Sequence, residues 1–243
     1  MASTERFGRI SEIAIDDPAT WEDRLFLTLD VDWAHDEVVA EAAGLLEQAG
    51  VAATWFVTHA TPVLERLRAN GRFELGIHPN FNFLIDRCDP RNGAGAEEVV
   101  DRLLAIVPEA KAVRSHAMTQ SSNLMALFGS KGLTHDSNHF IPEQSGIALK
   151  PWRHWSGIVK VPYFWEDDVR CLSPRNTPIA ELVARPGLKV FDFHPIHLFL
   201  NTETMDRYEA ARPDFGDPRA LLARRHAGAG TRNLLAELMA FAD

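Results

Sequence analysis

The chain has little cysteine and no long apolar run. Cys88 and Cys171 are the only cysteines in 243 residues and form no C-x-x-C pair, so neither a disulfide framework nor a thiolate zinc site is indicated. No stretch approaches the ~20 apolar residues of a membrane span. Residues 1–17 carry charges of both signs in place of the apolar core of a signal peptide. We therefore expect a cytoplasmic protein.

An excess of basic residues is also missing. The chain holds 25 Lys and Arg against 34 Asp and Glu, a net charge of −9, which argues against a general nucleic-acid-binding face or a polybasic membrane anchor. The hydrophobic content of 46% allows a substantial core and fits one large domain better than two small ones. We expect a single domain over 1–243, with a core at about 25–200 and a helical C-terminal part at 201–243.

Short apolar runs alternate along the chain with segments of helical period. We expect strands at 25–32, 51–57, 73–77, 112–115, 132–134, 157–162 and 188–193. Helices are expected at 36–48, 62–69, 95–107, 122–128, 178–183, 218–225 and 231–241. Strands separated by helices in this way favour an α/β fold with a mostly parallel sheet.

Polar residues collect where the expected strands end. They are Asp30 and Asp32, Thr58 and His59, His78, Arg114 and His116, Asp136 and Asn138, Glu166 to Asp168, and Asp192 with His194. The carboxyl ends of parallel strands meet at one edge of a sheet or barrel, and functional sites are built there. We expect the site at this edge.

The pair Asp30 and Asp32 poses a chemical question, because alternate residues of a strand share a face. Like charges that close raise each other's pKa unless a cation or a hydrogen-bond network offsets them. His78 ends a neighbouring strand and would make half of a divalent-metal site with these acids, although a lone histidine there is also a common structural residue. Asn82 could share a helix face with His78 if the chain turns into a helix at that point.

These motifs resemble the polysaccharide deacetylase family, also called NodB-homology or carbohydrate esterase 4, and within it the WbmS-like subgroup. The resemblance covers residues 25–198 and implies a distorted (β/α)7 barrel of the NodB type. It implies that Asp30, in Thr28-Leu-Asp30-Val-Asp32, is the catalytic base and Asp32 a metal ligand. It further implies that His194, at the end of Phe191-Asp192-Phe193-His194, is the general acid. The segment Arg114-Ser-His116 would form a wall of the groove, and Arg114 would hold Asp30 in place and tune its pKa.

The resemblance assigns His78 and Asn82 to the metal, but with a departure from the family pattern. The family motif is H-x-x-x-H, and Asn82 replaces the second histidine with an amide oxygen that binds most transition metals more weakly. Three outcomes stay open: Asn82 ligates through oxygen, His116 or His194 completes the shell, or no metal binds. The implied cofactor is a divalent ion, zinc first, with cobalt, iron, manganese or nickel as alternatives.

The implied activity is metal-dependent removal of an N-acyl group, acetyl first, from an amino sugar in polysaccharide or O-antigen biosynthesis. We expect a small-molecule, lipid-linked or nucleotide-linked saccharide as substrate, with His116, Trp165 and Asp168 as its contacts, since aromatic faces stack on sugar rings. Core packing of the tryptophan is the alternative. Two other functions stay open: an inactive saccharide-binding or scaffold protein, and hydrolysis of another C–N bond such as a formamide. Nothing in the sequence sets the oligomeric state.

Overall fold

One curled sheet organises the protein. In the computed structural model, which describes residues 5–85, 95–173 and 177–242, the strand order is β7-β8-β6-β5-β4-β3-β2-β10-β9, and β1 pairs with β2 beside this path. The strands are β1 (Phe7–Gly8), β2 (Leu25–Asp30), β3 (Ala53–Val57), β4 (Phe73–Ile77), β5 (Ala112–Val113), β6 (His135–Asp136), β7 (Trp152–Arg153), β8 (Val159–Lys160), β9 (Trp165–Glu166) and β10 (Lys189–Phe193). Every pairing is parallel except that of β7 with β8.

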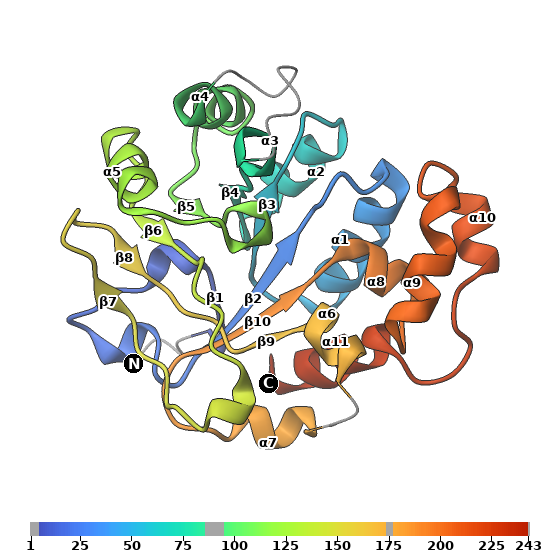
Figure 1. The fold of residues 1–243 in the computed structure, drawn as a ribbon. Helices are drawn as coiled ribbons and strands as arrows, with labels where there is room; N and C mark the ends of the chain where they lie inside the picture. Colours follow the sequence, from blue (N-terminus) through green and yellow to red (C-terminus); the bar gives the residue numbers. More distant parts are fainter. Residues whose placement is uncertain (1–4, 86–94, 174–176, 243) are drawn as a thin grey trace.

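Helices surround the strands (Figure 1), so the sheet forms a half-barrel and the expected α/β distorted barrel is confirmed. They are α1 (Asp36–Ala49), α2 (Val63–Ala69), α3 (Asn82–Ile85), α4 (Ala96–Ile106), α5 (Ser122–Ser130), α6 (Asp167–Leu172), α7 (Ile179–Val183), α8 (Pro195–Leu200), α9 (Met205–Ala211), α10 (Pro218–Ala223) and α11 (Thr231–Met239). Among the described residues, no helix combines the length and the apolar character that crossing a bilayer requires.

The central strands read as apolar runs because both of their faces are covered. All six residues of β2 and all five of β3 and of β10 are buried. Parallel strands with helices outside bury both faces, which explains the absence of a simple apolar-polar alternation. The buried polar exceptions in these strands include Thr28, Asp30 and Asp192, and each of them belongs to the hydrogen-bond network of the site described below.

Several elements differ from the sequence expectation. The strand expected at 132–134 lies at His135–Asp136, and the two-residue strands β1, β7 and β9 were not expected. Strands of two residues have no measurable period, so the pattern cannot reveal them. Helix α8 was also missed, because all six of its residues are buried and it therefore shows no polar face. Cys171 is a free, partly buried thiol, and Cys88 lies outside the described residues.

Candidate metal and catalytic site

Strand β2 ends at Asp30, so the expectation that Asp32 shares a strand face with Asp30 is wrong. The turn after β2 brings Asp32 to the site in an unusual backbone conformation. Asp32 has φ of 45° and Trp33 has φ of 57°, the left-handed region that costs a non-glycine residue about 1–3 kcal/mol. The backbone N–H of Trp33 donates to the Thr58 hydroxyl at 3.1 Å, and that of Val31 donates to the Phe56 carbonyl at 3.1 Å. These bonds hold the turn against the next strand, β3, and Asp32 lines the same cavity as Asp30.

Three donor atoms face one another beside this turn. Asp32 Oδ1 lies 3.1 Å from His78 Nε2 and 3.1 Å from His116 Nδ1, and the two ring nitrogens are 3.3 Å apart. The three atoms are close enough together to hold one cation. Two imidazoles and one carboxylate suit zinc and similar divalent metals. The residues present therefore fit a metal.

The two neighbouring imidazoles lower the pKa of Asp32. Burial alone would raise the pKa of Asp32, but hydrogen bonds from His116 and His78 outweigh burial and hold it well below its usual range. The carboxylate therefore stays ionised, which is the form that binds a cation.

Asn82 does not join this group. Helix α3 begins at Asn82, whereas His78 directly follows β4, so the expectation that the two share a helix face is wrong. The Asn82 backbone N–H donates to Asn80 Oδ1 at 2.9 Å, and its side-chain oxygen accepts from the Thr119 hydroxyl at 3.3 Å. Of the three outcomes left open by the sequence, the geometry favours the one in which His116 completes the shell, so His116 moves from a substrate contact to a candidate ligand.

Arg114 is buried at the centre of a polar network behind the cavity. Its Nη1 donates to Thr28 Oγ1 and Asp30 Oδ1, each at 3.0 Å, and also to Asp192. Its Nε donates to the Ser137 carbonyl at 3.0 Å, and its Nη2 donates to the Ser137 hydroxyl at 3.1 Å. The guanidinium is thus fixed from several directions, and it fixes one oxygen of Asp30 in turn.

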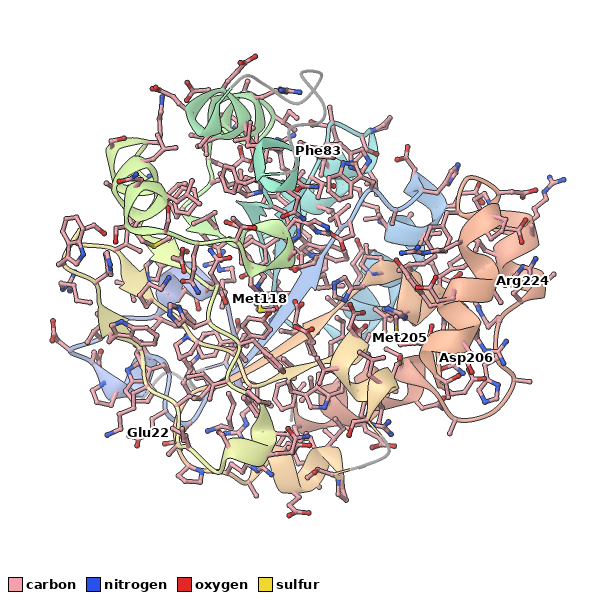
Figure 2. The ribbon with its side chains drawn as sticks, viewed as in Figure 1. Glu22, Phe83, Met118, Met205, Asp206 and Arg224 are labelled. Carbon is pink, nitrogen blue, oxygen red and sulfur yellow. The ribbon has the colours of Figure 1, made fainter. Side chains whose placement is uncertain are left out.

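The remaining oxygen of Asp30 faces the candidate ligands. Asp30 Oδ2 lies 3.6 Å from His78 Nδ1, a buried nitrogen that has no hydrogen-bond partner within the described part of the chain. The Asp30 residue is 5% exposed, yet it lines the cavity of about 180 Å³ that Asp32 and His116 also line. Met118, which lies near the middle of the view in Figure 2, lines this cavity too. Asp30 is therefore placed to accept a proton from a water in the cavity.

His194 lines the same cavity as Asp30 and is oriented by Asp167. The His194 backbone N–H donates to Asp167 Oδ2 at 2.8 Å, and its Nδ1 lies 2.7 Å from Asp167 Oδ1. This pairing leaves His194 Nε2 on the cavity side, 3.8 Å from Asp32 Oδ2. Burial alone would lower the pKa of His194, but the charges of Asp168 and Asp167 outweigh it and raise the pKa well above its ordinary value. His194 can therefore carry a proton into the reaction.

Asp168 extends the network around His194, together with His197 and Glu166, to which the sequence analysis gave no role in the site. Asp168 Oδ1 lies 2.7 Å from His197 Nε2, and His197 Nδ1 lies 3.0 Å from the Thr202 hydroxyl. The burial of Glu166 and, against the pull of His194, the nearby charge of Asp168 raise the pKa of Glu166 to about 7. Sequence analysis gave His197 no role, although its place three residues after His194, in a helix opened by a proline, is a usable signal.

The structure does not support the prediction that Trp165 contacts the substrate. It is 4% exposed, and its ring packs against Phe191 and Phe193 with centroids 5.9 and 4.8 Å apart. Successive residues of a strand point to opposite faces, so Glu166 reaches the cavity and Trp165 enters the core. The alternative of core packing is the one that the structure shows, and Trp165 is not retained as a substrate contact.

Comparisons with known proteins agree with this geometry. A family model described as "WbmS-like: Polysaccharide deacetylase" matches residues 27–212. A crystal structure from Bordetella bronchiseptica, of WbmS, described as a polysaccharide deacetylase involved in O-antigen biosynthesis, is 43% identical, covers 98% of both chains and superposes with a TM-score of 0.90. A polysaccharide deacetylase structure from Mycobacterium smegmatis shares the fold at 16% identity, with a TM-score of 0.51 and coverage of 99% of this chain and 93% of that one. No curated protein matches the chain.

Proposed function

Because the chain belongs to the WbmS-like family of polysaccharide deacetylases, we propose that it is a metal-dependent hydrolase that removes an N-acyl group, acetyl first, from an amino sugar of a saccharide precursor. One observation carries the proposal. The triangle formed by Asp32, His78 and His116 has a proton acceptor and a proton donor beside it: Asp30 Oδ2 lies 3.6 Å from His78 Nδ1, and His194 Nε2 lies 3.8 Å from Asp32 Oδ2.

The chemistry divides among these groups. A divalent cation held by Asp32, His78 and His116 would supply an acidified water and polarise the amide carbonyl. Asp30, oriented by Arg114, accepts the proton of the attacking water. His194, oriented by Asp167, donates a proton to the departing nitrogen, since an amine is too basic to leave as an anion. Arg114 is thus a positioning residue, because it is 1% exposed and acts through Asp30.

The test begins with the purified protein loaded with zinc, cobalt, iron, manganese or nickel in turn. Bound metal is measured, and acetate release is followed from N-acetylated monosaccharides and their nucleotide-linked forms, with and without a chelator. We expect about one tightly bound ion per chain and release that stops when the ion is removed. Protein that binds no metal and releases no acetate, even with metal supplied, would defeat the proposal.

A matched pair of variants tests the ligand set. His116→Ala removes a proposed ligand and should weaken metal binding by 100-fold or more, an order of magnitude in line with the loss of one of three protein ligands. Among the described residues, the hydrogen bond that Asn82→Ala removes is the one from Thr119, and metal affinity should change by less than about threefold. The opposite ranking would restore Asn82 as the ligand.

A further inference from the structure

A second cleft adjoins the catalytic cavity and differs from it in character. The cleft measures about 210 Å³ and shares Asp32, His116, Asp168 and His194 with the first cavity. Its other lining residues are Trp33, Ala34, His35, Ile196, His197, Tyr208 and Phe215. Asp30 and Arg114 line the first cavity and do not line this cleft. The cleft therefore borders His194, the proposed proton donor, and two of the candidate metal ligands, Asp32 and His116, but not Asp30, the proposed base.

Aromatic side chains from two distant parts of the chain form its walls. Trp33, in the strained turn after β2, is 47% exposed, and its ring meets that of His116 edge-on at 5.1 Å. Tyr208 belongs to α9, and its ring centroid lies 4.8 Å from that of His197 and 5.2 Å from that of Phe215. Exposed aromatic surface beside a reaction centre is a binding surface for ligands with an apolar face and polar edges.

The C-terminal wall is firmly attached to the rest of the fold. A second core cluster joins α1, α8, α9 and α10 through Val38, Ile196, Phe199, Leu200, Ala211 and Leu221, and Tyr208 and Phe215 pack against it. The beginning of α9, marked by Met205 and Asp206 in Figure 2, lies on the same side of the molecule as Arg224. The cleft wall is therefore a preformed surface.

We propose that this cleft holds the pyranose ring whose amino group the reaction releases, so that Trp33, Tyr208 and Phe215 select the sugar. The inference rests on the proposed function. The nitrogen that leaves must lie at His194, which lines both cavities. Asp30 lines the first cavity and not the second, so the second cleft gives the amine half of the substrate room beside the proton donor and clear of the base. An acetyl methyl group is similar in size to a water molecule, which needs about 10–15 Å³ of cavity volume. It would therefore leave most of the cleft of about 210 Å³ empty. Asp168 and His35 supply polar edges for hydroxyl groups.

The experiment compares Trp33→Leu and Tyr208→Leu with Trp155→Leu. Trp155 is 76% exposed and lines neither cavity, so it controls for the loss of a surface tryptophan. Tyr208→Phe keeps the ring and should restore the Tyr208→Leu loss. Binding of N-acetylglucosamine and N-acetylgalactosamine to the zinc-loaded proteins is measured by ligand-observed NMR, with thermal unfolding and zinc content recorded for each variant. We expect affinity to fall about 10-fold in the two cleft variants and to stay constant in Trp155→Leu.

The outcomes separate the two proposals. Acetate release by the wild type, with sugar affinity and KM unchanged in both cleft variants, would overturn the cleft assignment and leave the hydrolase intact. The opposite result is that the zinc-loaded protein never releases acetate, while sugar affinity falls in both cleft variants. This result would support the cleft assignment and defeat the hydrolase proposal. A panel of N-acetyl and N-butyryl glucosamine adds a third arm. Variants that change the preferred acyl length, with sugar affinity unchanged, would place the acyl group in the cleft and overturn the assignment.

Discussion

Two buried ion-pair networks lie at the carboxyl ends of strands in the same sheet, and only one borders the cavity. In the first, Arg114 binds Asp30 and Asp192. In the second, Lys160 binds Asp136, and both oxygens of Asp136 are occupied because Asn138 donates to them at 3.1 Å from its backbone and 2.9 Å from its side chain. Both networks are almost entirely buried, so neither charge nor burial distinguishes them.

The difference lies in the unused acceptor capacity of the acids. Asp30 keeps one oxygen turned to the cavity and to His78, whereas Asp136 is saturated and does not line that cavity. Removing one partner of a buried ion pair typically costs about 3–5 kcal/mol, so the bonds to Asp136 matter for stability. A carboxylate with one free oxygen can also take a proton. The same strand-end position therefore serves stability in one place and, in our proposal, chemistry in the other.

Among the variants that test this comparison, Asp30→Asn should have the largest effect, and the effect should be on kcat. Asp30→Asn retains the shape of the side chain and most of its contacts but cannot accept a proton, so we expect kcat to fall by about 10²–10⁴. Zinc content and sugar affinity should stay near the wild-type values. The measurement is steady-state acetate release together with metal analysis of the same samples. A parallel loss of zinc would move Asp30 from the base to the ligand shell.

Breaking the second network should affect stability and not chemistry. Lys160→Met leaves Asp136 buried without its cation, which costs about 3–5 kcal/mol in free energy of unfolding. Urea unfolding monitored by tryptophan fluorescence measures this change as a lower midpoint at constant slope. At a temperature where the variant is fully folded, kcat should match the wild type. A kcat reduced in proportion to the lost stability would show that the two networks are not separable.

Glu166 should contribute the smallest effect, and it depends on pH. The folded-state pKa of Glu166 is about 7, above its ordinary value of 4.5, so the folded state binds this proton more tightly than the unfolded state does. Stability from this group is complete below pH 4.5 and is lost as pH rises through 7, up to about 3 kcal/mol. Glu166→Gln should remove this dependence in urea titrations at pH 5 to 8 with chelator present. Parallel curves for both proteins would contradict the shifted pKa.

Much of the architecture followed from the sequence, because long buried strands and amphipathic helices have distinct periods. The strand Phe73–Ile77 and the start of the helix at Asp36 lie where the pattern placed them. The position of the site at the strand ends also followed, since Asp30, Asp32, His78 and His194 meet there. Their proposed chemical roles stay predictions, as does the single-domain assignment.

The remaining parts depend on contacts that no local pattern encodes. Choosing His116 over Asn82 requires the path of the chain after β4 and β5, because a turn and the start of α3 separate Asn82 from His78. The saturation of Asp136 depends on Lys160, which is 24 residues away in sequence. The orientation of Trp165 depends on the register of the two-residue strand β9 against β10. Each of these is a tertiary outcome, and sequence alone left it open.

The left-handed turn at Asp32 and Trp33 couples two proposed properties of the protein, the binding of the cation and the recognition of the sugar. One residue of the turn supplies a proposed cation ligand, and the next supplies a wall of the proposed sugar cleft. An insertion or deletion in this turn would therefore disturb reactivity and selectivity together. Relatives with new sugar preferences should instead vary in the segment that carries Tyr208 and Phe215, which supplies none of the proposed cation ligands. Engineering of new specificities should begin at that C-terminal wall.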